Sequence, residues 1–168
     1  MKLGAGKAKG SSFERHIGTK LSLWLSNNER KDLVCRTVGS GAQFTFSKGS
    51  GNPGDLMGQH PIAFKFFENY ACECKFWRNL EIIKFLEKEG DLYRALRKVQ
   101  REAESQSKQW ILIAKQNHRK ILLFLPTQSM LNSTQKIGQL NFHVIFSGTV
   151  YMFEFENFLS VIQPEDLT

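Results

Sequence analysis

The chain has 168 residues, the usual size of one domain, and 41% of them are hydrophobic, which supports a packed core and excludes a low-complexity disordered protein. A net charge of +7 favours a polyanionic partner, nucleic acid first, although solubility alone also explains a basic chain. The sequence has no apolar run long enough for a membrane span, no secretory signal, and three cysteines without paired spacing, so we expect a reduced, cytoplasmic protein without a membrane partner.

The N-terminal segment 1–10 is rich in Gly and Lys and is expected to be flexible. A helix is predicted to begin at Ser11 and to end at Asn27 and Asn28. Its buried stripe recurs at helical spacing: Phe13, Ile17, Leu21, Trp24 and Leu25. Ser11 and Glu14 also have the spacing of a capping box, which gives Glu14 a purely structural explanation.

A long loop separates the first predicted strand, 33–38, from the next elements. Residues 39–58 are rich in Gly and Ser and include a short β-like piece, 43–46. Such a loop inside a compact domain is more often functional than accidental. Two strands joined by a turn are predicted to follow, at 63–67 and 70–77.

The second half of the chain alternates helix and strand patterns. A helical region over 80–88 precedes a helix over 91–104 that Asp91 can cap. A short helix over 155–162 is predicted to close the chain. Four further strands are predicted, at 110–115, 120–125, 142–146 and 150–154. This order predicts a single α/β domain over 1–168, with a central mixed sheet flanked by helices and 127–168 as a C-terminal extension of the core.

The strand over 70–77 carries charged residues beside an apolar face. Its side chains alternate, so Glu73 and Lys75 share one face, and the other is apolar: Tyr70, Cys72, Cys74 and Phe76. A carboxylate and an ammonium beside a core strand are costly unless they are paired or functional. Taken alone, a cross-face ion pair on a solvated surface explains them equally well.

Asp55 favours a functional role for Glu73 and Lys75 over a surface ion pair. It stands eighteen residues before Glu73, after Pro53 and Gly54, where an aspartate alone is usually a turn residue. With Glu73 and Lys75 it completes a PD-(D/E)xK pattern. Two hard carboxylates can hold Mg²⁺, and the neighbouring lysine can orient or help deprotonate the attacking water.

Further motifs stand in the same order as in a known family. The stretches are Lys9-Gly10-Ser11-Ser12-Phe13-Glu14-Arg15, then Val34-Cys35-Arg36, Gly39-Ser40-Gly41, Gly54-Asp55 and Glu73-Cys74-Lys75. As an ordered set they resemble the archaeal-type Holliday junction resolvases. The segment from Asp91 to Lys115 is similar to phage-encoded resolvases. The resemblance covers about residues 9–125 and implies a restriction-endonuclease-like fold.

The resemblance also implies roles for single residues. Asp55 and Glu73 would be metal ligands together with the backbone carbonyl of Cys74, and Lys75 would be the catalytic lysine. Glu14 would reach the metal or its water, and Ser40 matches an active-site serine loop. The implied cofactor is Mg²⁺, with Mn²⁺ as a substitute. The sequence departs from the archaeal pattern in a longer loop between Ser40 and Asp55 and in Ala42 after Gly41, and the part from about Thr127 has no counterpart.

The predicted DNA contacts lie mainly on the helix over 91–104. Its apolar stripe is Leu92, Leu96, Val99 and Ala103, and its basic stripe is Arg94, Arg97, Lys98 and Arg101. A charged helix face is usually only solvated, but in a DNA-cleaving protein it can follow phosphates. Gln100 resembles a glutamine found after the catalytic strand in several nucleases of the superfamily; a partly buried polar residue is the alternative. The full predicted set is Lys9, Arg15, Arg36, Arg94, Arg97, Lys98, Gln100, Arg101 and Lys115.

Three functional hypotheses follow. The first is a metal-dependent endonuclease that resolves four-way DNA junctions by paired cuts and is therefore a homodimer. The others are a nuclease of the same fold with another DNA target, and a DNA-binding module without cleavage. The dimer contact is placed partly on C-terminal aromatic residues, which could instead extend the monomer core: Phe142, Phe146, Tyr151, Phe153, Phe155 and Phe158. Scattered histidines and the lack of a P-loop or a Ser/His/Asp signature argue against a zinc protein, an ATPase or a serine hydrolase.

Overall fold

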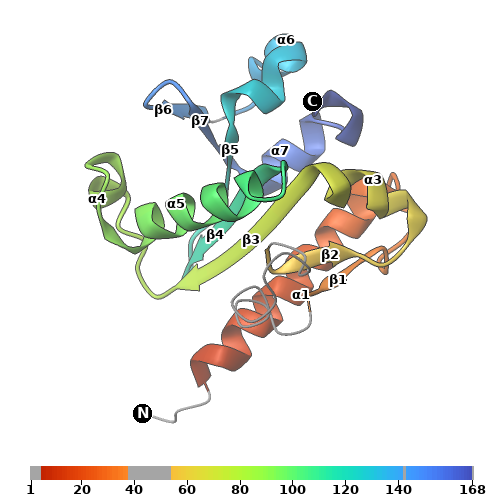
Figure 1. The fold of residues 1–168 in the computed structure, drawn as a ribbon, viewed down its shortest axis with the longest axis horizontal. Helices are drawn as coiled ribbons and strands as arrows, with labels where there is room; N and C mark the ends of the chain where they lie inside the picture. The colour runs from red at the N-terminus through yellow and green to blue at the C-terminus, as the bar shows by residue number, and fades with distance from the viewer. Residues whose placement is uncertain (1–4, 38–53, 142, 168) are drawn as a thin grey trace.

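The computed structural model describes residues 5–37, 54–141 and 143–167 (Figure 1). Its centre is a five-stranded sheet in the order β3-β4-β5-β7-β6. The strands are β3 (Tyr70–Trp77), β4 (Gln109–Gln116), β5 (Ile121–Pro126), β6 (His143–Phe146) and β7 (Val150–Glu154). Only β3 and β4 pair in parallel, and the other neighbours are antiparallel. The predicted α/β class with a mixed sheet flanked by helices is confirmed.

One face of the sheet is covered by the connection between β3 and β4. This crossover contains α4 (Ile82–Leu86), shorter than the predicted 80–88, and α5 (Gly90–Glu104). The apolar stripe predicted for α5 is buried: Leu92, Leu96, Val99 and Ala103. The predicted cap is wrong, because Glu89 holds the N-cap position and Asp91 lies inside the first turn, where its negative charge still suits the positive end of the helix.

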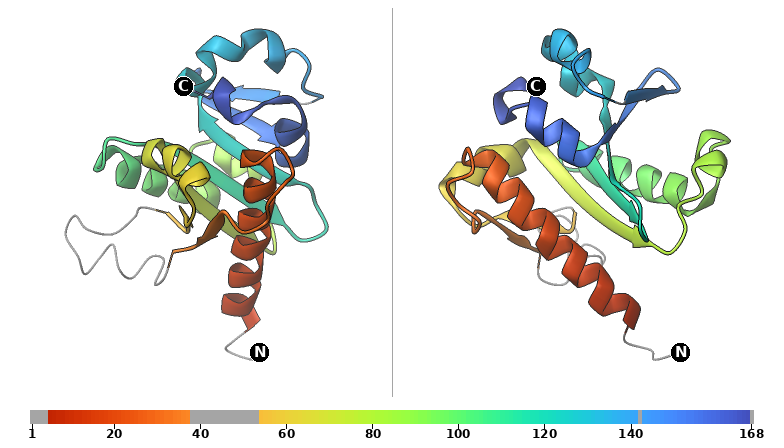
Figure 2. Two further views of the ribbon diagram at one scale, coloured as in Figure 1. Left: turned by 90° about the vertical axis from the view of Figure 1, so that its right-hand side faces the viewer. Right: turned by 180° about the vertical axis from the view of Figure 1, so that it is seen from behind.

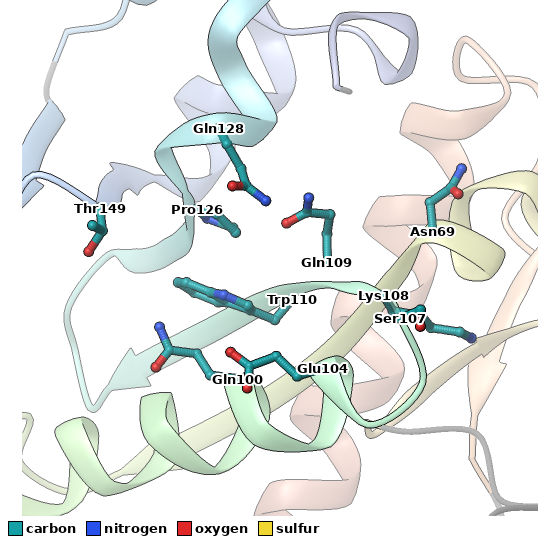
Figure 3. Close-up of a pocket in the computed structure, with 10 residues that line it drawn as sticks. All are labelled: Asn69, Gln100, Glu104, Ser107, Lys108, Gln109, Trp110, Pro126, Gln128 and Thr149. Carbon is teal, nitrogen blue, oxygen red and sulfur yellow. The ribbon is translucent and has the colours of Figure 1, made fainter.

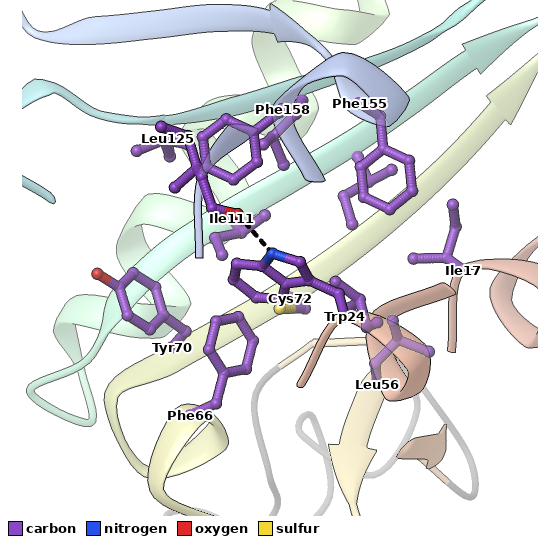
Figure 4. Close-up of a cluster of buried hydrophobic side chains, with 14 of the residues drawn as sticks. Ile17, Trp24, Leu56, Phe66, Tyr70, Cys72, Ile111, Leu125, Phe155 and Phe158 are labelled. Atoms are coloured by element: carbon purple, nitrogen blue, oxygen red, sulfur yellow. Dashed lines mark hydrogen bonds between the residues drawn. The ribbon is translucent and has the colours of Figure 1, made fainter. Parts of the chain in front are cut away.

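The opposite face packs against α1 (Ala5–Leu25) and α7 (Phe155–Val161), as the views in Figure 2 show. Figure 4 shows this core, in which the Trp24 indole N–H donates to the carbonyl oxygen of Ile162 at 2.7 Å. The predicted start of α1 at Ser11 is wrong, as is the capping box, because the helix begins at Ala5 and Ser11 lies inside it. Residues 5–10 are therefore helical, and alanines and lysines among them favour helix.

A second, two-stranded sheet lies beside β3. It pairs β1 (Val34–Arg36) with β2 (Leu56–Gly58) in antiparallel register. The strand predicted over 63–67 is wrong: α3 (Pro61–Asn69) occupies this segment. Pro61 opens the helix, and the His60 side chain accepts a hydrogen bond from the backbone N–H of Ile62. A short apolar run does not distinguish a buried strand from a helix. The predicted β-like piece at 43–46 lies outside the described residues.

The C-terminal region completes the central sheet. The predicted hairpin is confirmed, and β7 pairs with β5, so the segment after residue 127 contributes two strands of the five. Between and after them lie η1 (Thr127–Ser133), α6 (Thr134–Ile137) and η2 (Pro164–Asp166). Four of the aromatics proposed for a dimer contact are buried within the chain: Phe146, Phe153, Phe155 and Phe158. For these four the dimer interpretation is wrong. Tyr151 packs against the same core, and Phe142 lies outside the described residues.

Candidate active site

The chain brings Asp55 to the outer edge of β3 through a close backbone approach. The backbone N–H of Asp55 donates to the carbonyl of Cys72 at 2.7 Å, and Gly54 forms a parallel bridge with Cys72. Gly54 has a φ of +94°, and a Cβ atom there would lie 2.4 Å from the Cys72 carbonyl oxygen. Only glycine fits this position. The Gly-Asp pair therefore has a structural reason as well as a chemical one.

Asp55 and Glu73 meet at the Lys75 ammonium. The nitrogen lies 2.5 Å from Glu73 Oε1, 3.4 Å from Asp55 Oδ2 and 3.3 Å from the Cys74 carbonyl oxygen. Asp55 and Glu73 are 6% and 1% exposed. The structure thus brings together the three oxygen groups predicted as metal ligands, and all three face one cation.

A second lysine reaches the same carboxylate from α5. The Lys98 ammonium lies 3.0 Å from Glu73 Oε1 and 3.4 Å from Glu102 Oε2. Sequence reasoning placed Lys98 in the DNA-binding stripe and missed this contact. Glu73 and Lys98 are 25 residues apart, and only the packing of α5 over β3 brings them together. Helical periodicity alone contains no signal that would have shown it.

Burial and neighbouring charges act in opposite directions on these groups. Burial alone would raise the pKa of Glu73, but Lys75 and Lys98 outweigh it and the pKa is lowered. For Asp55, burial and the Glu73 carboxylate raise the pKa in spite of Lys75. Burial alone would lower the pKa of Lys75 and of Lys98. The neighbouring carboxylates outweigh this effect, so the pKa of each lysine is raised. The cluster therefore holds an ionised Glu73 between two charged lysines, and Asp55 is the carboxylate that is harder to ionise.

Glu14 and Arg36 form an ion pair beside this cluster. The Arg36 Nε donates to Glu14 Oε2 from β1 to α1, and the Glu14 side chain is only 12% exposed. The Glu14 charge also contributes to the raised pKa of Asp55, so it lies within electrostatic reach of the carboxylates. Its direct partner is Arg36, however, and none of the three oxygen groups. Ser40 lies outside the described residues.

The remaining predicted DNA contacts fall into two places. Lys9 lies over the Phe76 ring at 3.8 Å from the centroid, and the Lys115 ammonium is 5.6 Å from that centroid, so both cations meet near the end of β3. The Lys9 ammonium also donates to Asn117 Oδ1 at 2.6 Å. Exposed arginines line the outside of α5 and α1: Arg94, Arg97, Arg101 and Arg15. Gln100 lies on the other flank of α5 from Lys98 and does not join the carboxylates.

The donor set fits a hard divalent cation. Within residues 5–37, 54–141 and 143–167 no group of three or more His, Cys, Asp or Glu side chains could hold a metal. Mg²⁺ does not need one, because it is usually bound through one or two carboxylates and keeps several waters. Asp55, Glu73 and the Cys74 carbonyl supply such oxygens, and they already face a cation.

A hollow of about 680 Å³ lies elsewhere on the same side of the sheet (Figure 3). Polar residues from several elements line it, among them Asn69, Gln100, Glu104, Gln109 and Gln128, together with Trp110. The carboxylate cluster does not line this hollow.

Comparison with protein families agrees with the geometry. Residues 5–168 match the model of the family described as "Phage putative PDDEXK endonuclease". The chain belongs to this family. The match extends through the C-terminal strands, for which the resolvase resemblance offered no counterpart. PDDEXK nucleases generally use divalent metals, in agreement with the oxygen donors at Asp55 and Glu73.

Comparison with the curated proteins gave no match, and neither did comparison with the solved structures. No helix in the described part of the chain combines the length and the apolar character needed to cross a membrane.

Proposed function

We propose that this protein is a Mg²⁺-dependent endodeoxyribonuclease that cleaves branched DNA and resolves four-way junctions by paired symmetric cuts. The observation that carries the proposal is the convergence of Asp55 Oδ2, Glu73 Oε1 and the Cys74 carbonyl on one cation, the Lys75 ammonium. A divalent cation bound by the same oxygens would displace the ammonium. Mn²⁺ serves as a substitute, since it also prefers oxygen ligands.

The residues around the site then have distinct tasks. A bound Mg²⁺ would supply Lewis-acid stabilisation of the charge that develops on the phosphate. Asp55, Glu73 and the Cys74 carbonyl would hold the ion, and the Lys75 ammonium beside them would orient the attacking water. Lys98 remains on Glu73 from α5 and keeps that carboxylate in place. The Glu14–Arg36 pair borders the site from α1 and β1.

The substrate follows from charge and from the resemblance of the N-terminal motifs. A net charge of +7 favours DNA, and the exposed Arg94, Arg97 and Arg101 give α5 a basic outer surface. Each chain contributes one set of Asp55, Glu73 and Lys75. Resolving a junction needs two symmetric cuts, which a two-fold homodimer supplies. The site of action is the cytoplasm of a prokaryotic, archaeal or phage-infected cell.

The test is cleavage of four labelled substrates by the full chain: a four-way junction, a flap, a nicked duplex and a linear duplex. We expect cleavage of the junction with Mg²⁺ or Mn²⁺, none with EDTA, and none by Glu73→Gln under any condition. Preference for the flap or the nicked duplex would overturn the junction assignment. Cleavage of no DNA substrate with either metal would overturn the nuclease itself.

A further inference from the structure

The hollow beside α5 lies close to the catalytic cluster but on the other side of that helix. In the register of β3 and β4, Ala71 pairs with Trp110 and Glu73 pairs with Leu112. Side chains alternate, so Glu73 and Trp110 point to the same face of the sheet. They are two residues, roughly 7 Å, apart along the strands. The hollow is therefore within one or two nucleotides of a phosphate bound at Glu73.

Helix α5 forms a ridge between the two places. Lys98 and Glu102, one turn apart, share the flank that faces Glu73. Gln100 and Glu104, also one turn apart, share the flank that lines the hollow (Figure 3). Arg97 is exposed between the flanks, and its guanidinium donates to Gln100 Oε1 at 2.8 Å. DNA that lies across this basic ridge reaches both sides of it.

The chemistry of the hollow differs from that of a phosphate site. Its Lys108 ammonium donates to the Phe67 carbonyl oxygen at 2.7 Å, and Glu104 would repel a phosphate. Amides from three elements contribute other polar walls: Asn69, Gln100 and Gln109. Asn69 Nδ2 already donates to the Lys65 carbonyl and Gln100 Oε1 accepts from Arg97, so a ligand meets the Asn69 amide oxygen, the Gln100 amino group and the Gln109 amide. Such walls suit a neutral ligand with alternating donors and acceptors.

Trp110 carries a hydrogen-bond donor and lines the hollow. It is only 7% exposed and lines the hollow, with Gln100 and Pro126 on either side of the ring in Figure 3. Its indole N–H has no hydrogen-bond partner among the described residues, although the matching N–H of Trp24 does. The indole nitrogen does not belong to the buried polar atoms that lack a partner, so it is open to solvent and can donate to a ligand in the hollow.

We propose that the hollow binds an unpaired nucleobase of the DNA whose neighbouring phosphate is cut at Glu73 and Lys75. The edge of a base offers the alternating donors and acceptors that amides and carboxylates recognise. Pairing hides the Watson–Crick edge, so a pocket that reads this edge needs an unpaired base, and branch points provide such bases. The inference rests on the proposed nuclease function. It adds that the protein recognises branched DNA through an unpaired base next to the cleaved phosphate.

The test compares two DNA duplexes that differ in one base. Both carry a single extra nucleotide as a bulge, either with its base or as an abasic site, and each of the four bases is tried in turn. Binding by the full chain is measured in EDTA by fluorescence anisotropy. We expect the duplex with the base to bind about 10-fold tighter than the abasic duplex for at least one base, the usual effect of one bound base.

Two variants assign this preference to the hollow. Gln109→Ala and Trp110→Phe should each reduce the base-to-abasic ratio by at least about 3-fold and leave the affinity for the abasic duplex unchanged, because they remove one base contact from the wall of the hollow. Trp110→Phe keeps an aromatic filler, so the core is preserved. Gln139→Ala is the matched control, since Gln139 is exposed and does not line the hollow.

Several results would overturn the inference. Equal affinity for both duplexes with every base, or a ratio that both variants retain, would show that the hollow holds no base. A change of sedimentation mass in either variant would assign the hollow to a protein contact instead. If these results came with normal Mg²⁺-dependent junction cleavage, only this inference would fall. A protein that neither binds nor cleaves branched DNA would remove the proposed function as well.

Discussion

Two groups of charged residues lie at opposite parts of the molecule and are built differently. At the edge of β3, the buried Glu73 carboxylate forms ion pairs with both Lys75 and Lys98. Lys75 forms a second ion pair with Asp55. Near the C-terminus, Lys136 contacts both oxygens of Asp166 at 2.8 and 2.6 Å, and the lysine is 40% exposed.

The shared, buried charges at β3 are typical of a functional site, whereas the Lys136–Asp166 pair is typical of a structural contact. The Lys136–Asp166 pair, with side chains 40% and 18% exposed, ties η2 to α6 at a smaller desolvation cost than a carboxylate as buried as Glu73. Buried charges that share partners are a weak source of stability, because desolvation offsets much of their attraction. A fold keeps them where another ligand will use them. The following predictions test whether the two groups respond in this way.

The largest expected effect is on cleavage. Asp55→Asn, Glu73→Gln and Lys75→Ala should each lower the rate of junction cleavage by at least about 100-fold, because each removes a proposed metal ligand or the proposed water-orienting group. Circular dichroism should show an unchanged fold. Asp166→Asn is the control and should cleave like the wild type. Wild-type cleavage by any of the first three would remove that residue from the site.

The second effect concerns metal affinity without any reaction. Because the Lys75 ammonium occupies the three oxygens, Lys75→Ala should bind Mn²⁺ more tightly than the wild type, by about 10-fold, as the removal of a competing cation implies. Lys98→Ala removes the same charge but touches only one of the three oxygens, so its effect should be smaller. Calorimetric titration with Mn²⁺ measures both. An unchanged affinity in Lys75→Ala would mean that the ammonium and the metal use different places.

The third effect is on DNA binding. Replacing Arg94, Arg97 and Arg101 by Gln should weaken junction binding and reduce the slope of log affinity against log salt by about 0.9 for each phosphate that the protein no longer neutralises. Lys136→Gln, at the C-terminal pair, is the control and should leave the slope unchanged. Equal slopes for the wild type and the triple variant would show that the α5 ridge does not touch the phosphates.

The smallest effect is on stability, and here the two groups should differ in sign. The pKa of Asp166 is lowered, because hydrogen bonds from Lys136 and the Gln163 backbone N–H outweigh burial. Its ionised form therefore stabilises the fold above pH ~4, and this contribution disappears as the pH falls through the lowered pKa. Asp166→Asn should lower the free energy of unfolding at pH 7 by about 0.5 kcal/mol, as expected for a partly exposed ion pair.

Asp55 has the opposite linkage. Burial and Glu73 raise its pKa, so its ionised form destabilises the fold above that raised pKa, and the penalty disappears as the pH falls through it. Asp55→Asn should therefore increase the free energy of unfolding at pH 7, measured by urea denaturation without metal. A decrease would mean that the Asp55 carboxylate serves the fold as well as the proposed chemistry.

Sequence reasoning succeeded where a residue pattern was local. The alternation over β3, the stripe on α5 and the order of Asp55, Glu73 and Lys75 were all readable, and the structure places these three together. It failed where packing decides. The apolar run in α3 fits a strand as well as a helix until Phe66 and Phe67 find their neighbours.

Some contacts of the candidate site could not be predicted from the sequence. Lys98 lies in a regular basic stripe, and only the three-dimensional position of α5 turns it toward Glu73. The aromatic residues of the C-terminal region are a second example. Their number favoured a contact with a second subunit. The hairpin of β6 and β7 instead extends the sheet, and Phe153 and Phe155 are buried in the same core as β3.

Cleavage of a supercoiled plasmid that extrudes a cruciform tests the central claim most directly. Paired, metal-dependent cuts at two Asp55–Glu73–Lys75 sites should convert the plasmid to linear DNA with little nicked circle at any time, in Mg²⁺ and not in EDTA. Glu73→Gln should leave it supercoiled. Nicked circles that accumulate first, or a plasmid that stays supercoiled with the wild-type protein in Mg²⁺, would contradict the account.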